Sequence, residues 1–251
     1  MTKALVFALL TLLPFGTFAQ SNKPDQRKDS VTVSAGISKE QLALEDQLND
    51  TVSQGDQFLK NGNTSDAIKQ YRNALELIQK QPLLVEQEPR VQRKLAVGYI
   101  RADQPSDAIP IYSKLLDARK QDCGANSEKP WDCADAEYEL GRAKMFAADF
   151  VGALVLFNDA DSKYVQAEKL NSLSHEFAMI QLKSQGETKI LIGVALSRTG
   201  KTPEAITAVD TAIAQLTRVQ SDETINVGIR DDAARHLQEA KAILSRLKST
   251  Q

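Results

Sequence analysis

The same spacing of small and apolar residues occurs four times along this chain, and that repetition constrains the fold more than any other feature. A small residue is followed twelve positions later by alanine, then four positions on by a large apolar residue, then three further on by a small or apolar one. The four sets are Gly55, Ala67, Tyr71 and Ala74; Ala96, Ala108, Tyr112 and Leu115; Gly141, Ala153, Phe157 and Ala160; and Gly193, Ala205, Val209 and Ala212. Steps of three and four keep side chains on one face of a helix, and a small residue lets a second helix approach closely. Each set therefore predicts two helices packed together as a hairpin.

Short polar turns separate the two helices of each predicted hairpin. They are Gly62-Asn63, Asp103-Gln104, Ala148-Asp149 and Gly200-Lys201. Helix starts follow two of them: Asn63 or Thr64 precedes Asp66, and Thr202 is followed by Pro203, which we expect at the first helical position. A single hairpin cannot bury its apolar face alone, so we expect four of them to stack into a superhelix.

At these residues the chain resembles the tetratricopeptide repeat (TPR) family, over about residues 38–220. The family pattern, Leu-Gly in the first helix and Ala-Ile, Tyr and Ala-Leu in the second, matches Leu140-Gly141, Ala67-Ile68, Tyr71 and Ala74-Leu75. The alanines of successive units are 41, 45 and 52 positions apart, whereas the family repeat is about 34, so the units resemble the long-helix, kinesin-light-chain-like subtype. The resemblance implies an all-α, right-handed superhelical α-solenoid of about four antiparallel hairpins.

The N-terminal residues have the layout of a secretory signal peptide. Met1-Thr2-Lys3 is a short basic start, Ala4 to Leu13 is almost entirely apolar, and Thr17-Phe18-Ala19 supplies small residues before a cleavage point. A membrane anchor is the alternative, but this apolar run is short for a bilayer core of about 30 Å. We therefore expect residues 1–19 to be cleaved after Ala19 and the protein to be periplasmic or secreted, with no integral membrane span once the signal is removed.

Two further segments lie outside the repeats, one before them and one after them. Residues 20–37 are polar and without periodicity, which indicates a flexible linker. Ser38 and Gln41 have the spacing of a capping box, so we expect the first helix to begin there. Residues 221–251 contain apolar residues at helical spacing up to Leu247, which predicts a C-terminal helix that caps the array with a polar outer face.

Composition and motifs exclude several classes of function. The 251 residues include 31 Lys+Arg and 33 Asp+Glu, a net charge of −2, which gives no electrostatic reason to bind nucleic acid. The string from Ala195 to Thr202 is similar to a phosphate-binding loop but has no preceding strand, so it indicates an inter-helix turn. His175 and His236 lack a second histidine at metal-binding spacing, and no nucleophile has a partnering base. We expect no catalytic residues, no metal site and no cofactor.

The two cysteines, Cys123 and Cys133, flank a loop between the second and third predicted hairpins. In an oxidising compartment they would form a disulfide that ties the end of one helix to the start of the next. Two free thiols are the alternative, and the predicted export favours the disulfide. Trp131, two residues before Cys133, is expected to pack over it or over a neighbouring helix end.

In TPR arrays the first helices of the hairpins line a concave groove, so the resemblance implies a binding surface there. Transferred one position at a time, the groove residues are Asn49, Val52, Asp56, Leu59, Arg90, Arg93, Val97, Ile100, Arg101, Asp135, Tyr138, Arg142, Met145, Phe146, Glu187, Ile190, Val194 and Arg198. The middle of this surface contains Arg90, Arg93, Arg101, Tyr138, Arg142 and Met145, which we interpret as a site for an extended acidic or carboxylate-ended peptide. Equally, the arginines could be solvated or paired with Glu86, Glu88 and Glu137.

Three classes of function stay open at this point. The favoured one is an exported, non-catalytic protein-interaction scaffold that binds a protein or peptide partner. A structural component of a cell-envelope assembly is the alternative, and a ligand-binding or enzymatic helical domain is a third. The sequence identifies neither the partner nor the oligomeric state.

Overall fold

The computed structural model describes residues 39–120, 123, 129–169 and 174–249, and every regular element within them is a helix. The predicted signal peptide and linker lie outside these residues. In chain order the elements are α2 (Lys39–Lys60), α3 (Thr64–Lys80), the 3₁₀ helix η1 (Pro82–Gln87), α4 (Glu88–Arg101), α5 (Pro105–Arg119), α6 (Pro130–Phe146), α7 (Phe150–Glu168), α8 (His175–Arg198), α9 (Thr202–Gln220) and α10 (Val227–Ser249).

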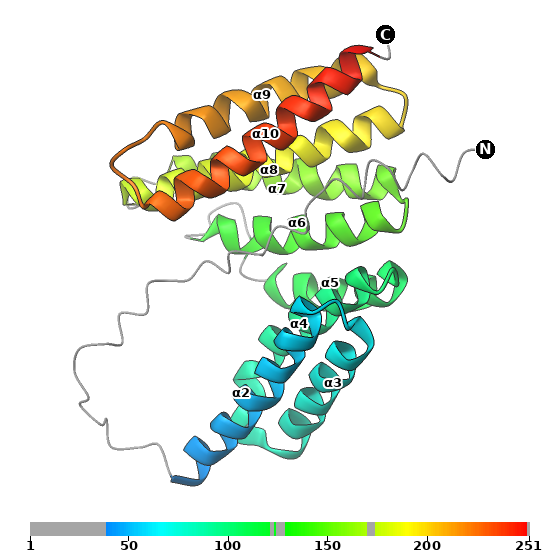
Figure 1. The fold of residues 1–251 in the computed structure, drawn as a ribbon, viewed down its shortest axis with the longest axis vertical. Coiled ribbons are helices and arrows are strands. Elements are labelled where there is room, and N and C mark those ends of the chain that lie inside the picture. The colour runs from blue at the N-terminus through cyan, green and yellow to red at the C-terminus, as the bar shows by residue number, and fades with distance from the viewer. Residues whose placement is uncertain (1–38, 121–122, 124–128, 170–173, 250–251) are drawn as a thin grey trace.

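The helices pair in the order that the repeated spacing predicts: α2 with α3, α4 with α5, α6 with α7, and α8 with α9. Each hairpin stacks on the next, and α10 packs on α9 and touches α8 (Figure 1). The hairpin α2–α3, at the bottom of the view, is steeply inclined to the helices α6–α9 above it (Figure 1). The prediction of an all-α solenoid with four hairpins and a C-terminal capping helix is confirmed.

Small residues in the first helices set how closely the second helices approach. A Cβ atom added to Gly55 would lie 2.6 Å from Cε1 of Tyr71, and one added to Gly141 would lie 2.7 Å from Cε1 of Phe157. Both distances are well inside van der Waals contact, so each glycine is required by the aromatic ring that lies against it. Gly193 meets Val209 in the same way in the fourth hairpin. In the first, third and fourth hairpins, the residues sixteen positions apart are therefore in direct packing contact.

All four inter-helix turns share one backbone geometry. The first turn residue of each has a positive φ: Gly62 (79°), Asp103 (58°), Ala148 (62°) and Gly200 (82°). The next N–H then donates back to the carbonyl five residues earlier, as Asp149 does to Lys144 at 2.8 Å. This is the Schellman ending of a helix, which satisfies carbonyls that the helix leaves unpaired.

Side-chain caps then start several second helices. The Asn63 side chain accepts a hydrogen bond from the Asp66 N–H, as the sequence predicts, and Asp149 does the same for Gly152. The helix α9 differs slightly from expectation, because it begins at Thr202 and leaves Pro203 at its second position.

The core runs the length of the array in two main clusters. One joins α2 to α6 and the other joins α6 to α10, and the alanines of the repeat are fully buried in them. Among the helices described, none is both long and apolar enough to cross a membrane.

The two cysteines form the predicted disulfide. Cys123 follows α5 and Cys133 lies in the first turn of α6, with their Cα atoms 5.8 Å apart. The bond therefore links the second hairpin to the third. Trp131 packs edge-on against Phe177 at the start of α8, with ring centroids 5.0 Å apart, so it covers a neighbouring helix end.

Candidate binding surface on the first helices

Polar side chains of α2, α4 and α6 contact one another across the first helices of the hairpins. Arg90 on α4 donates to Asn49 on α2 at 2.8 Å, and Lys94 binds the Asp56 carboxylate on α2 at 2.7 Å. Arg93 on α4 pairs with Glu139 on α6 at 2.9 Å. We call this surface the first-helix face; its polar residues are Asn49, Asp56, Arg90, Arg93, Lys94, Arg101, Asp135, Tyr138, Glu139 and Arg142.

Arg93 forms an ion pair with a buried carboxylate. The Glu139 side chain is 5% exposed and that of Arg93 is 32% exposed. Burial raises the pKa of the Glu139 carboxyl, and the charge of Arg93 opposes that rise. Because a carboxylate this deep needs a counter-charge, Arg93 serves the fold at this junction between the second and third hairpins.

Arg101 and Arg142 form the second feature of the face. Arg101 donates to the Leu59 carbonyl at 3.4 Å, and the guanidinium of Arg142 lies over the Tyr138 ring, 5.7 Å from its centroid. Burial lowers the pKa of Arg101, and the positive charge of Arg142 lowers it further. The two guanidinium groups are therefore near enough to repel each other.

Tyr138 joins this pair to the core. It is half-buried, its ring centroid lies 6.1 Å from that of Phe157, and burial is the main cause of its raised pKa. The neighbouring Asp135 carboxylate is exposed and accepts a hydrogen bond from the Tyr164 hydroxyl at 2.6 Å. The middle of the face thus presents the Arg142 guanidinium over an aromatic ring, with Arg101 near enough to repel it.

Several residues expected in the groove lie elsewhere. Met145 is fully buried among α7 and α8 side chains in the C-terminal core cluster, so the expectation that it contacts a ligand is wrong. The same holds for four other apolar positions, each no more than 9% exposed: Val52, Ile100, Ile190 and Val194. They pack in the core because stacked hairpins need apolar contacts between their first helices.

Two of the three acids that the alternative pairing named bind lysines. Glu88 binds Lys114 at 3.2 Å, and Glu137 binds Lys163 at 2.5 Å on α7. Arg93 is indeed paired, but with Glu139, which the sequence did not single out.

Sequence reasoning also missed a cluster between α8 and α10. Glu187 of α8 and Asp232 and His236 of α10 bring their ligand atoms within 4.8 Å of one another. Lys183 binds both Glu187 and Asp232 at 2.7 Å. Burial raises the pKa values of both carboxyls, but neighbouring positive charge outweighs it and the net pKa is lowered in each. The four-residue spacing of Asp232 and His236 on one helix was the available signal.

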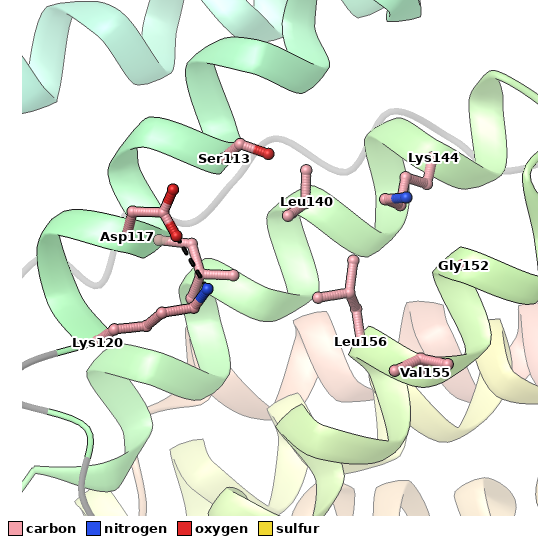
Figure 2. A pocket seen from close by; sticks show the side chains of 9 residues that line it. Ser113, Asp117, Lys120, Leu140, Lys144, Gly152, Val155 and Leu156 are labelled. Carbon is pink, nitrogen blue, oxygen red and sulfur yellow. Dashed lines mark hydrogen bonds and ion pairs between the residues drawn. The ribbon is translucent and has the colours of Figure 1, made fainter.

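A shallow depression is lined by side chains of α5, α6 and α7 (Figure 2). Its volume is about 350 Å³, and leucine and valine side chains make up much of its lining. Its charged groups pair with acids: Lys120 with Asp117 at 2.9 Å, and Lys144 with Asp149 at 2.8 Å. It therefore lacks the convergent reactive groups of an active site.

Two solved structures are similar to the chain over most of its length. A kinesin light chain-like protein of Podosopora anserina, with nearly identical TPR-like repeats, aligns with a TM-score of 0.50 and 16% sequence identity over 81% of this chain and 93% of that one. BtubC (BKLC) from P. vanneervenii aligns with a TM-score of 0.51 and 17% identity over 83% of this chain and 81% of that one. No protein-family model matches the chain, and no curated protein matches its sequence. The similarity concerns the fold: this chain has the fold of TPR-like helical repeats.

Proposed function

We propose that this protein is an exported, non-catalytic interaction scaffold whose first-helix face binds an acidic or carboxylate-ended peptide segment of a partner protein. The observation that carries the proposal is the closeness of the Arg101 and Arg142 guanidinium groups, the second of which lies over the Tyr138 ring. Arginine recognises carboxylates through two parallel hydrogen bonds, and an anion between two repelling cations relieves their repulsion.

The charge balance of the face supports the same partner. Of the polar residues that define the face, Arg90, Arg93, Lys94, Arg101 and Arg142 are positive, and Asp56, Asp135 and Glu139 are acidic. The face therefore carries two more positive than negative side chains, on a chain whose overall net charge is −2. A local excess of this kind attracts anionic segments and raises their association rate.

Export is part of the proposal and rests on two features. The first 19 residues have the layout of a signal peptide, and the disulfide between Cys123 and Cys133 belongs to an oxidising compartment. Fractionation of cells that produce the tagged protein tests it. We expect a chain shortened by about 19 residues in the periplasm or medium, whereas an intact cytoplasmic chain would contradict export.

The binding proposal is tested by fluorescence anisotropy with a labelled ten-residue peptide that contains four glutamates and a free C-terminal carboxylate. We expect saturable binding that weakens as salt rises, and an affinity at least about tenfold lower in the Arg101→Ala/Arg142→Ala variant, because two charge-assisted bonds are lost. Arg218→Ala is the matched control, since Arg218 is exposed on the second helix α9.

Other outcomes separate the parts of the proposal. Equal binding of an amidated peptide would assign recognition to the glutamates, and its loss would assign it to the terminal carboxylate. Unchanged affinity in the double arginine variant, or equal binding of a lysine-substituted peptide, would contradict the proposed site.

A further inference from the structure

The cluster between α8 and α10 combines the side chains that hold a transition metal. Asp232 and His236 are four residues apart on α10, so they share one helix face, and Glu187 faces them from α8. All three side chains are less than one-fifth exposed, at 17% for Glu187, 18% for Asp232 and 15% for His236. One imidazole and two carboxylates from two helices are a donor set that suits zinc.

A neutral His236 side chain cannot donate to both of the carboxylates that lie beside its ring. Its Nε2 lies 3.4 Å from Glu187 Oε1, and its Nδ1 lies 3.4 Å from Glu239 Oε2. A neutral imidazole carries one N–H, so one of the two carboxylates must face a nitrogen lone pair. In addition, Oε1 of Glu239 is buried and has no hydrogen-bond partner.

A metal at Nε2 resolves the first of these features, because both imidazole nitrogens then have a partner. We propose that Glu187, Asp232 and His236 bind a zinc ion that fastens the capping helix α10 to α8. Zinc–ligand bonds of about 2.0–2.2 Å place neighbouring tetrahedral ligand atoms about 3.3–3.6 Å apart, and the Nε2 to Oε1 distance of 3.4 Å fits that spacing. With Nε2 on the metal, Nδ1 keeps its proton and donates to Glu239, the usual second partner of a metal-bound histidine.

Lys183 marks the position of the cation. Its ammonium binds Glu187 and Asp232, each at 2.7 Å, and so takes the place between them that the zinc ion would occupy. Arg235 also binds Asp232. With neutral His236, the three carboxylates outweigh Lys183 and Arg235 by one negative charge; exchanging the lysine for zinc brings the cluster to neutrality. Zinc therefore competes with the Lys183 ammonium for the two carboxylates.

Calorimetric titration of the chelator-treated protein with zinc chloride tests the site. We expect one zinc per chain, lost in His236→Ala and weakened about tenfold in Glu239→Gln, which removes the negative charge of the imidazole's second partner. His175→Ala is the control, because that histidine is 60% exposed, pairs with Asp222 and lies outside the cluster.

A second variant keeps the inference independent of folding defects. Lys183→Met removes the competing ammonium, so we expect a lower melting temperature without zinc, tighter zinc binding than in the parent, and recovery of the melting temperature when zinc is added. The recovery should be absent in Lys183→Met/His236→Ala.

Three results would overturn the zinc site. One is zinc binding that persists unchanged in His236→Ala. Another is the absence of binding in both the parent and Lys183→Met. The third is stabilisation of the parent on acidification from pH 7 to 5.5, dependent on His236 but insensitive to zinc, which would make the cluster a proton-responsive ion-pair network.

Discussion

At the scale of single residues, two arginines that the sequence places in the same groove have different surroundings. Arg93 neutralises Glu139, whose side chain is 5% exposed, whereas Arg142 lies over an aromatic ring and repels Arg101. The first arrangement stabilises the fold, and the second brings two positive charges together at the place where we propose that a ligand binds. A surface that binds often keeps such locally unfavourable contacts, at some expense in stability.

Replacing Arg93 therefore tests the fold and not the binding site. We expect Arg93→Ala to lower the free energy of unfolding by about 2–4 kcal/mol, somewhat less than for a fully buried pair because Arg93 is partly exposed. Urea unfolding followed by circular dichroism measures it. Arg90→Ala is the control, with an expected loss below about 1 kcal/mol, since its partner Asn49 is neutral and exposed. A loss in Arg93→Ala no larger than in Arg90→Ala would contradict the structural role.

The turn residue Ala148 provides a test in which a substitution should stabilise the fold. Its φ of 62° costs an alanine about 1–2 kcal/mol, and the equivalent turns use Gly62 and Gly200. We expect Ala148→Gly to raise the free energy of unfolding by about 0.5–1 kcal/mol after the added chain entropy of glycine is subtracted. The neighbouring Ala147 has a φ of −78°, so Ala147→Gly should destabilise. Equal effects in the two variants would argue against strain at position 148.

At the scale of elements, the close approach of α6 and α7 depends on Gly141. A Cβ there would lie 2.7 Å from Phe157, so we expect Gly141→Ala to destabilise by about 1–3 kcal/mol through overpacking. Trimming the ring in Gly141→Ala/Phe157→Leu should recover part of the loss. If the destabilisation of the double variant equalled the sum of the effects of the two single substitutions, the contact between Gly141 and Phe157 would not limit the approach of α6 and α7.

The junction between α9 and α10 should respond to acid. Hydrogen bonds from the Thr224 hydroxyl and N–H, and then from His175, lower the pKa of Asp222 to about 2. A carboxyl whose pKa is depressed in the folded state stabilises it above the unfolded value, and that contribution disappears as the pH falls. We expect the stability difference between the parent and Asp222→Asn to shrink as the pH falls from 4 to 2.

Thermal melts of the two proteins across that range measure this effect. Thr224→Val should reproduce part of the effect of Asp222→Asn, because it removes the hydroxyl that is the largest cause of the lowered pKa of Asp222. A difference that stays constant down to pH 2 would show that Asp222 contributes no linked stability.

At the scale of the whole molecule, the sequence predicted contacts between residues that are close together in the chain. It did not predict the pairing of residues that are far apart in the chain. The four hairpins, their turns and the disulfide follow from residues at most sixteen positions apart, such as Gly55 and Tyr71 or Cys123 and Cys133. Arg93 and Glu139 are 46 positions apart, and Lys183 and Asp232 are 49 apart. Such pairs depend on the rotation of one hairpin on the next, which no short spacing specifies. The burial of Met145 was missed for the same reason.

The central claim is that partners bind the first-helix face, and photo-crosslinking in the native host tests it most directly. A photoreactive residue replaces Val97, which lies on α4 within that face, or Val151, which is 67% exposed on the second helix α7. We predict a discrete crosslinked protein from position 97 that is lost with Arg101→Ala/Arg142→Ala and is competed by the acidic peptide, with none from position 151. Crosslinking only from position 151, or crosslinking from position 97 that ignores both arginines, would contradict the account.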